Sequence, residues 1–252
     1  MTPNAFKRGM KAGEAQIGLW ISLCSGFAAD IVADIGYDWL LLDMEHAPNE
    51  LPTVLQQLQS VRAYSSTALV RPMWNDFVLV KRLMDIGAPG LLFPMVQNAE
   101  EAAAAVAACR YPPKGIRGVS NTQRGNRYGR DPQYFEQVEE ETCILVQVET
   151  KDALERVEEI AAVEGVDGVF FGPADIAASL GLMNKLTDDA LWRVIFDAAD
   201  KVKALGKPCG TLVGNAELTK RVLDEGFLFV AVGSDHSLLA RGAEALLARS
   251  RG

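Results

Sequence analysis

The sequence predicts a (β/α)8 barrel, from its length and from the alternation of apolar and helical segments. The chain has 252 residues, a usual size for this fold as one domain. Eight short apolar segments alternate with helix-like segments from end to end. Two of them, 39–42 and 228–232, are apolar throughout, as expected of parallel strands buried on both faces. We therefore expect a single barrel domain over residues 1–252.

The expected strands are apolar segments that stop at turn-forming or charged residues. The third ends at Arg71 and Pro72, the fourth at Pro94, and the sixth at Gly172 and Pro173, where proline and glycine interrupt regular structure. The eight expected strands are 17–23, 38–43, 67–70, 90–93, 143–148, 168–171, 208–213 and 228–232.

The expected helices follow from apolar residues at helical spacing and from their end signals. In 49–62 the apolar side chains fall on one face, and the alanine-rich 99–109 ends before two prolines at 112 and 113. The full set is 26–35, 49–62, 76–86, 99–109, a short helix at 132–138, then 151–161, 174–180, 188–205, 216–225 and 234–248.

One segment, 114–130, breaks this alternation. It is rich in Gly, Arg and Asn and has no apolar periodicity, which indicates a functional or mobile loop. An open doubly wound sheet is the alternative fold. It is disfavoured because no GxGxxG motif follows the first expected strand.

Composition excludes several classes of function. Hydrophobic residues make up 49% and charged residues 23% of the chain, and the formal net charge is −8. This balance argues against nucleic acid or an anionic membrane as the main partner. The four cysteines are scattered without a CxxC pair, which favours reduced thiols and a cytoplasmic location. No stretch of about 18 apolar residues predicts a membrane span.

Polar residues gather where the expected strands end, and that end of a barrel carries the active site. This pattern indicates an enzyme. The residues are Trp20 and Ser22; Asp43, Glu45 and His46; Arg71; Gln147 and Glu149; Gly172 to Asp175; Leu212; and Gly233, Ser234 and Asp235.

Glu149 and Asp175 follow two successive buried strands. Two carboxylates, with water and substrate completing the shell, suit Mg²⁺ or Mn²⁺. The alternative is that each carboxylate only caps its helix. At the start of the expected helix 174–180, unpaired backbone N–H groups of Gly172, Ala174 and Asp175, next to Pro173, would favour an anionic ligand.

The other rim residues have plausible roles and structural alternatives. His46 suits a general base, with Glu45, Asp43 or, across the barrel, Asp85 as its carboxylate partner; alternatively it makes only a local hydrogen bond. Arg71 would bind a carboxylate or an oxyanion, or pair with Asp43 or Glu45. Gln147 would donate to a carbonyl oxygen, or serve structure alone. Trp20 and Leu212 would form pocket walls, or pack in the core.

The sequence resembles the HpcH/HpaI aldolases, the metal-dependent (class II) pyruvate aldolases. The resemblance covers about residues 19–235. It is carried by 38–49 (DWLLLDMEHAPN), 71–76 (RPMWND), 93–102 (FPMVQNAEEA), 111–119 (YPPKGIRGV), 145–150 (LVQVET) and 166–175 (VDGVFFGPAD).

The resemblance implies a phosphoenolpyruvate/pyruvate-type barrel that cleaves 4-hydroxy-2-oxo acids reversibly to pyruvate, or hydroxypyruvate, and an aldehyde, in aromatic or sugar-acid catabolism. Glu149 and Asp175 would hold the divalent metal, with Mg²⁺ or Mn²⁺ favoured over Co²⁺ or Zn²⁺. Arg71 and Gln147 would stabilise the enolate, and His46, made more basic by Asp85, would be the acid/base. The backbone from Gly172 to Asp175 would bind the pyruvate carboxylate. The resemblance also implies a homohexamer of dimers that exchange the eighth helix.

No lysine lies in an expected strand, which favours a metal over a Schiff-base lysine as the means of stabilising the enolate. Two rivals to the aldolase are a non-catalytic barrel that binds pyruvate or a similar small acid, and a related lyase acting on phosphoenolpyruvate or CoA thioesters.

Overall fold

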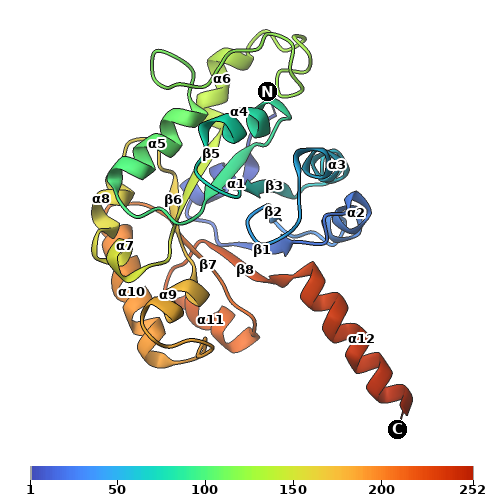
Figure 1. The fold of residues 1–252 in the computed structure, drawn as a ribbon, viewed down its shortest axis with the longest axis vertical. Coiled ribbons are helices and arrows are strands. Elements are labelled where there is room, and N and C mark those ends of the chain that lie inside the picture. The colour runs from blue at the N-terminus through green and yellow to red at the C-terminus, as the bar shows by residue number, and fades with distance from the viewer. Residues whose placement is uncertain (1, 252) are drawn as a thin grey trace.

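The fold is a closed barrel of eight parallel strands in the order β1 to β8, seen in a computed structural model that describes residues 2–251 (Figure 1). All eight expected strands are confirmed, within two residues at their ends. They are β1 (Gln16–Ile21), β2 (Trp39–Asp43), β3 (Thr67–Arg71), β4 (Gly90–Phe93), β5 (Cys143–Val148), β6 (Gly168–Phe171), β7 (Cys209–Leu212) and β8 (Phe229–Ser234).

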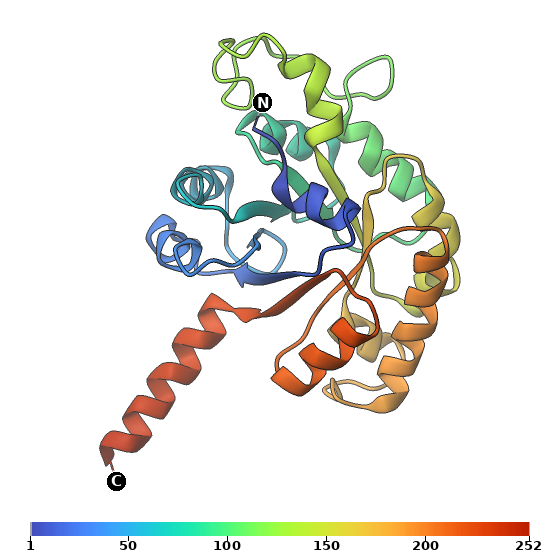
Figure 2. The same cartoon turned by 180° about the vertical axis from the view of Figure 1, so that it is seen from behind.

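Helices follow every strand and form an outer layer around the barrel (Figures 1 and 2). The expected helix 151–161 is two short helices, because the chain turns at Arg156, where the backbone leaves the helical region. The helices are α1 (Ala5–Lys11), α2 (Gly26–Ala33), α3 (Leu51–Val61), α4 (Phe77–Asp85), α5 (Ala99–Cys109), α6 (Tyr134–Glu141), α7 (Lys151–Glu155), α8 (Val157–Ala162), α9 (Pro173–Ser179), α10 (Asp189–Ala204), α11 (Ala216–Asp224) and α12 (Asp235–Arg251).

The sequence analysis missed α1, which lies across the amino-terminal end of the barrel (Figure 2). Its Phe6 ring is 5.6 Å from the ring of Trp39 and 5.9 Å from that of Phe229. Gln16 donates from Nε2 to the Phe6 carbonyl at 2.9 Å. Lys7 donates from Nζ to the Thr142 carbonyl at 2.6 Å. These contacts cover the amino-terminal end of the barrel interior.

Inside the barrel, aromatic rings from several strands fill the space. Trp20 is 6.0 Å from Trp39 and 5.4 Å from Phe170, measured between ring centroids. A Cβ atom added to Gly18 would lie 2.2 Å from the Trp39 ring, so that position must be glycine for the indole to fit. The barrel is therefore a packed core, as expected for this fold.

The last helix, α12, differs from the others because it leaves the barrel (Figures 1 and 2). Among its described residues only Asp235 is buried. Leu238, Leu239, Leu246 and Leu247 are all exposed. An apolar face of this kind on a solvated helix marks an interaction surface.

The segment 114–130 is irregular, as expected, but it is organised around one buried side chain. Arg117 donates from Nη2 to Asp85, Gln123 and Tyr134 at 2.9–3.1 Å. Its guanidinium lies 4.5 Å from the centre of the Tyr111 ring, a cation–π distance. This arginine joins the segment to the end of α4.

In residues 2–251, no helix is long and apolar enough to cross a membrane.

Candidate active site

The carboxyl ends of β2, β3, β5 and β6 bring four acidic residues and one arginine to the same end of the barrel. Asp43 pairs in register with Arg71 across β2 and β3, and Gln147 with Phe170 across β5 and β6. Glu149 follows β5 directly, and Asp175 lies in the first turn of α9. Because adjacent parallel strands end together, the fold gathers side chains that are far apart in sequence.

Arg71 is held by two carboxylates and an indole. Its Nε and Nη2 donate to the two Asp43 carboxylate oxygens at 2.8 Å each. Its Nη1 forms an ion pair with Glu45 Oε2 at 2.8 Å. The angles of this contact do not meet those of a hydrogen bond, and Glu45 Oε2 has no hydrogen-bond partner within residues 2–251. The guanidinium carbon is 5.3 Å from the Trp20 ring centre. The expected alternative, pairing with Asp43 or Glu45, is thus present, and it leaves the guanidinium rigid and buried.

Trp20 and Leu212 both line the interior beneath the rim. Trp20 is buried under the Arg71 guanidinium, and Leu212 is half-buried and packs against the inner aromatic cluster. Most of the surface of these two side chains is therefore packed in the core, which was the alternative to a role as pocket walls. Trp20 acts on the site through the orientation of Arg71.

Glu149 is the most enclosed of the rim carboxylates, with 1% of its surface exposed. Its Oε1 accepts a hydrogen bond from the Met95 backbone N–H at 2.7 Å, and its Oε2 accepts one from Gln147 Nε2 at 2.6 Å. Met95 has a φ of 54°, an uncommon conformation for a residue with a side chain. Strained backbone of this kind clusters at functional sites, and here it aims an N–H at the carboxylate.

The pKa of Glu149 is raised from 4.5 to about 7, mainly by burial and also by the nearby carboxylates of Glu45 and Asp175, against the lowering effect of the hydrogen bonds from Gln147 and Met95. Burial also raises the pKa of Glu45, against the lowering effect of Arg71. Carboxylates that repel one another in a low-dielectric site favour either a proton or a cation between them.

The start of α9 lies against the Glu149 carboxylate at Gly172. A Cβ atom added to Gly172 would lie 2.6 Å from Glu149 Oε2 and 3.2 Å from Gln147 Nε2. The absence of a side chain lets the backbone at the start of α9 approach Glu149. Asp175, three residues later, is exposed on the same side of the site, and its charge acts on Glu149.

These residues fit a divalent metal held by two carboxylates. No group of three or more His, Cys, Asp or Glu side chains in residues 2–251 is arranged to hold a metal ion. Glu149 and Asp175 would therefore supply two oxygens, and water and substrate the remainder. Mg²⁺ and Mn²⁺ commonly bind in this manner. The buried carboxamide oxygen of Gln147 has no hydrogen-bond partner, so this side chain still has bonding capacity toward a ligand.

His46 lies in the loop after β2, with 68% of its side chain exposed and Nε2 3.9 Å from Glu45 Oε2. Asn49 donates to the Asp43 carbonyl at 2.8 Å and fixes this loop. Asp85 is not close to His46 in this chain. It is the last residue of α4, a helix that starts near the carboxyl end of β3 and runs toward the amino end, and it pairs with Arg117 at 2.9 Å.

Asp43, considered above as a partner of His46 or of Arg71, pairs with Arg71, and Asp235, noted at the rim without a role, is a structural anchor. Asp235 accepts from the backbone N–H groups of Ser22 and Leu23 at 2.8 and 3.1 Å. It joins the ends of β1 and β8 at the start of α12. The sequence signal was an aspartate directly after the last strand, a usual helix-start residue.

A parallel eight-stranded barrel with a carboxylate cluster and a fixed arginine at the carboxyl strand ends defines a barrel enzyme with its catalytic centre at that rim. Its strands contain no lysine. The particular family is given by sequence: the HpcH/HpaI aldolase/citrate lyase model matches residues 16–242. The chain belongs to this family.

Individual relatives agree with this assignment. The chain is 53% identical over 247 residues to the 4-hydroxy-2-oxo-heptane-1,7-dioate aldolase of Klebsiella pneumoniae, covering 98% of this chain and 93% of that one. A HpcH/HpaI aldolase/citrate lyase family protein from Burkholderia cenocepacia superposes with a TM-score of 0.95 at 35% identity, over 99% and 100% of the two chains. A HpcH/HpaI aldolase from Desulfitobacterium hafniense superposes with a TM-score of 0.84 at 27% identity, over 96% and 95%.

Proposed function

We propose that the protein is a divalent-metal-dependent aldolase that cleaves 4-hydroxy-2-oxo acids reversibly to pyruvate, or hydroxypyruvate, and an aldehyde. The observation that carries the proposal is the buried Glu149, oriented by Met95 and Gln147 and approached closely by the backbone at Gly172. The name and the 53% identity of the Klebsiella relative support a 4-hydroxy-2-oxo dicarboxylate as substrate.

In this proposal Glu149 and Asp175 hold Mg²⁺ or Mn²⁺, and Co²⁺ or Zn²⁺ are alternatives of similar charge. The metal, when bound, acts as a Lewis acid toward the keto oxygen. Backbone N–H groups of Ala174 and Asp175 at the start of α9, together with Gly172 and Pro173, bind the carboxylate of the substrate. In the described chain these two N–H groups make no backbone hydrogen bond, as at other helix starts.

During cleavage a base removes the proton of the C4 hydroxyl, the C3–C4 bond breaks, and its electron pair forms the enolate of pyruvate as the aldehyde leaves. Arg71, already fixed by Asp43, stabilises the enolate oxygen, and Gln147 assists with its remaining N–H. Protonation at C3 then gives pyruvate. Trp20 and Leu212 bound the space around these groups.

His46 is the proposed acid/base, with its basicity raised by a carboxylate. Asp85 of the same chain does not fill that role, since it lies near the opposite end of α4 and pairs with Arg117. We therefore assign the role to Asp85 of a neighbouring copy. In such an assembly the active site is complete only between subunits.

The exposed leucines of α12 support an assembly in which this helix packs on a second copy. Leu238, Leu239, Leu246 and Leu247 are 50–62% exposed. Exposed Phe27 and Ile31 on α2 offer an apolar surface of the kind that such a helix would cover. A homohexamer of dimers that exchange α12, in the cytoplasm, is the assembly we propose.

The two rivals differ from the aldolase in a measurable way. A barrel that only binds a small acid predicts pyruvate binding without proton transfer. A lyase acting on phosphoenolpyruvate or CoA thioesters predicts turnover of those substrates and not of 4-hydroxy-2-oxo acids.

The test is exchange of the pyruvate methyl protons in D₂O, followed by NMR, with Mg²⁺ or Mn²⁺ and then with EDTA. We expect exchange that EDTA abolishes. Glu149→Gln should abolish it and Glu158→Gln, at an exposed position on α8, should not. Exchange that survives EDTA would refute the metal site. Pyruvate binding without exchange, and without cleavage of 4-hydroxy-2-oxo acids, would favour the binding barrel.

A further inference from the structure

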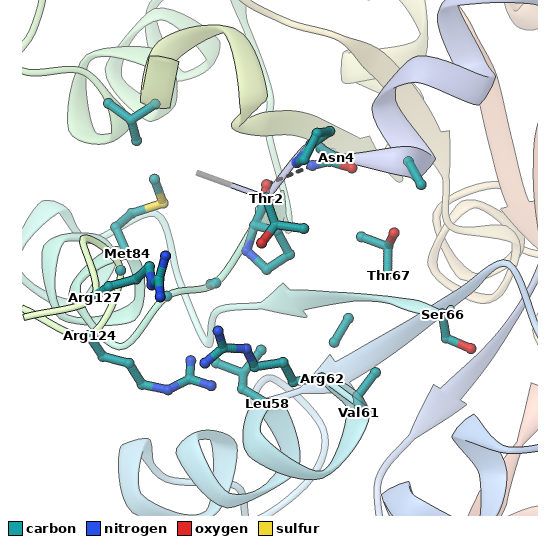
Figure 3. Close-up of a pocket in the computed structure, with 18 of the residues that line it drawn as sticks. Thr2, Asn4, Leu58, Val61, Arg62, Ser66, Thr67, Met84, Arg124 and Arg127 are labelled. Atoms are coloured by element: carbon teal, nitrogen blue, oxygen red, sulfur yellow. Dashed lines mark hydrogen bonds between the residues drawn. The ribbon is translucent and has the colours of Figure 1, made fainter. Parts of the chain in front are cut away.

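A second cavity lies at the amino-terminal end of the barrel, opposite the candidate active site (Figure 3). It has a volume of about 340 Å³, within the range of small-molecule sites. Its walls come from the end of α3, the starts of β3 and β4, the residues before α1, and the irregular segment ahead of α6.

Three arginines, Arg62, Arg124 and Arg127, line this cavity. Figure 3 shows the guanidinium groups of Arg62 and Arg124 directed toward one another from α3 and from the irregular segment. Arg124 donates from Nη1 to the Ile86 carbonyl at 2.5 Å. None of the three forms an ion pair with a carboxylate in residues 2–251.

The local charge is opposite to that of the whole protein. Among the described residues of the lining, Asp131 is the one acidic side chain beside the three arginines, in a chain of formal net charge −8. Burial and the charge of Arg62 both lower the pKa of Arg124. Like charges held together in this way are unfavourable in the empty cavity.

The backbone is shaped to hold Arg124 in place. Gly87 has a φ of +89°, and a Cβ atom there would lie 2.9 Å from Arg124 Nη1. Other polar groups at the cavity include the hydroxyls of Thr2 and Thr67 (Figure 3). Arginine forks with neighbouring hydroxyls are the usual means of binding phosphate and carboxylate groups.

We propose that this cavity is a binding site for a small anion with two or more negative charges, held between Arg62 and Arg124 with Arg127 at its edge. A phosphate compound and a di- or tricarboxylate share this chemistry. The site lies at the closed end of the barrel, beside α1, and so does not depend on the proposed aldolase reaction.

The experiment is isothermal titration calorimetry of the full chain, stripped of metal and then dialysed free of chelator, with three probes, inorganic phosphate, pyrophosphate and citrate. We expect saturable binding of at least one probe. Phosphate or pyrophosphate alone would identify a phosphate site, and citrate alone a carboxylate site. Because the Arg62 side chain makes no hydrogen bond within residues 2–251, Arg62→Gln is the cleanest variant; it should weaken binding at least about tenfold. Arg124→Gln should do the same.

The matched control is Arg193→Gln, which removes one exposed positive charge on α10 far from the cavity lining. It should bind as the wild type does. Glu149→Gln, which tests the aldolase site, should also keep the binding. If Arg62 had only a structural role, Arg62→Gln would have a lower melting temperature than the wild type without ligand. If the substitution relieves the like-charge contact, the melting temperature should not fall. No saturable binding of any probe, or binding unchanged in both cavity variants, would overturn the proposal.

Discussion

Arg71 and Asp43 form a bidentate ion pair at the ends of two adjacent strands, with both N···O distances at 2.8 Å. Both side chains are buried, so neither charge is balanced by water. Removing one partner from such a pair leaves an uncompensated buried charge.

We expect Asp43→Ala to lower the free energy of unfolding by about 3–5 kcal/mol and to reduce aldolase activity together with it. Arg71→Lys should keep the fold but lose the bidentate contact with Asp43. We therefore expect a large decrease in kcat with only a small decrease in the free energy of unfolding. Urea unfolding and steady-state kinetics measure the two effects. Asp34→Asn, at an exposed position after α2, is the control, and a loss of equal size there would contradict the argument.

The pH dependence of stability should reveal Glu149. Its pKa is raised from 4.5 to about 7 on folding, so the folded protein holds this proton at pH values where the unfolded chain has lost it. Between about pH 4.5 and 7 the metal-free protein therefore loses stability as pH rises, by about 3 kcal/mol in total. Glu149→Gln should remove this loss, and become more stable than the wild type at pH 8 in EDTA.

The measurement is urea unfolding of both proteins in EDTA at pH 5.5 and pH 8. Divalent metal should stabilise the wild type more at pH 8, because the carboxylate must be deprotonated to bind it. Parallel pH profiles of the two proteins would exclude the assignment of the raised pKa to Glu149.

Gly172→Ala should abolish metal binding while the barrel remains folded. The new methyl group would lie 2.6 Å from Glu149 Oε2, which forces the carboxylate or the start of α9 to move. Mn²⁺ titration calorimetry should show at least about a tenfold loss of affinity. Gly214→Ala is the matched control, because nothing lies within 4 Å of a Cβ atom there. Wild-type affinity in Gly172→Ala would count against this metal position.

If His46 works with Asp85 of another copy, two inactive variants should restore activity together. His46→Ala and Asp85→Ala are each expected to lower kcat by about 10²-fold or more. After co-expression in equal amounts, about a quarter of the sites would contain both native residues. Activity near that fraction of wild type is the expected result. A mixture no more active than either variant would exclude a site shared between copies.

The exposed face of α12 should control assembly. Leu238→Asp, which places a charge on this face, should shift the protein from a hexamer to smaller species in size-exclusion chromatography with light scattering. Leu186→Asp is the control, because Leu186 is also exposed and apolar but lies before α10. Identical elution of both variants and the wild type would rule out α12 as an assembly surface.

The strands were predictable because their apolar segments are continuous and end at proline, glycine or charge. The helix α1 was not, because Phe6 and Met10 are its only large apolar buried side chains, beside Lys7 and Gly9, and two are too few to form a periodic pattern. The rim residues were predictable because strand ends of a barrel meet at one end.

The expected pairing of His46 with Asp85 shows what reasoning from the strand ends alone misses. A helix of nine residues such as α4 spans roughly 13 Å, which carries Asp85 away from the rim on which His46 lies. The ion pairs of Arg71 with both Asp43 and Glu45 depend on side-chain packing. Sequence offered it only as an alternative to substrate binding.

The contact of α1 with β8 also orders events in time. Phe6 is synthesised long before Phe229, yet the two rings pack together in the finished barrel. The strands β1 and β8, joined from Gln16 to Phe229 onward, close over the same sequence distance. Such long-range closure is slow in folding. Helix α1 can therefore complete its docking only after β8 has been synthesised, and the nascent barrel stays open along that seam until then.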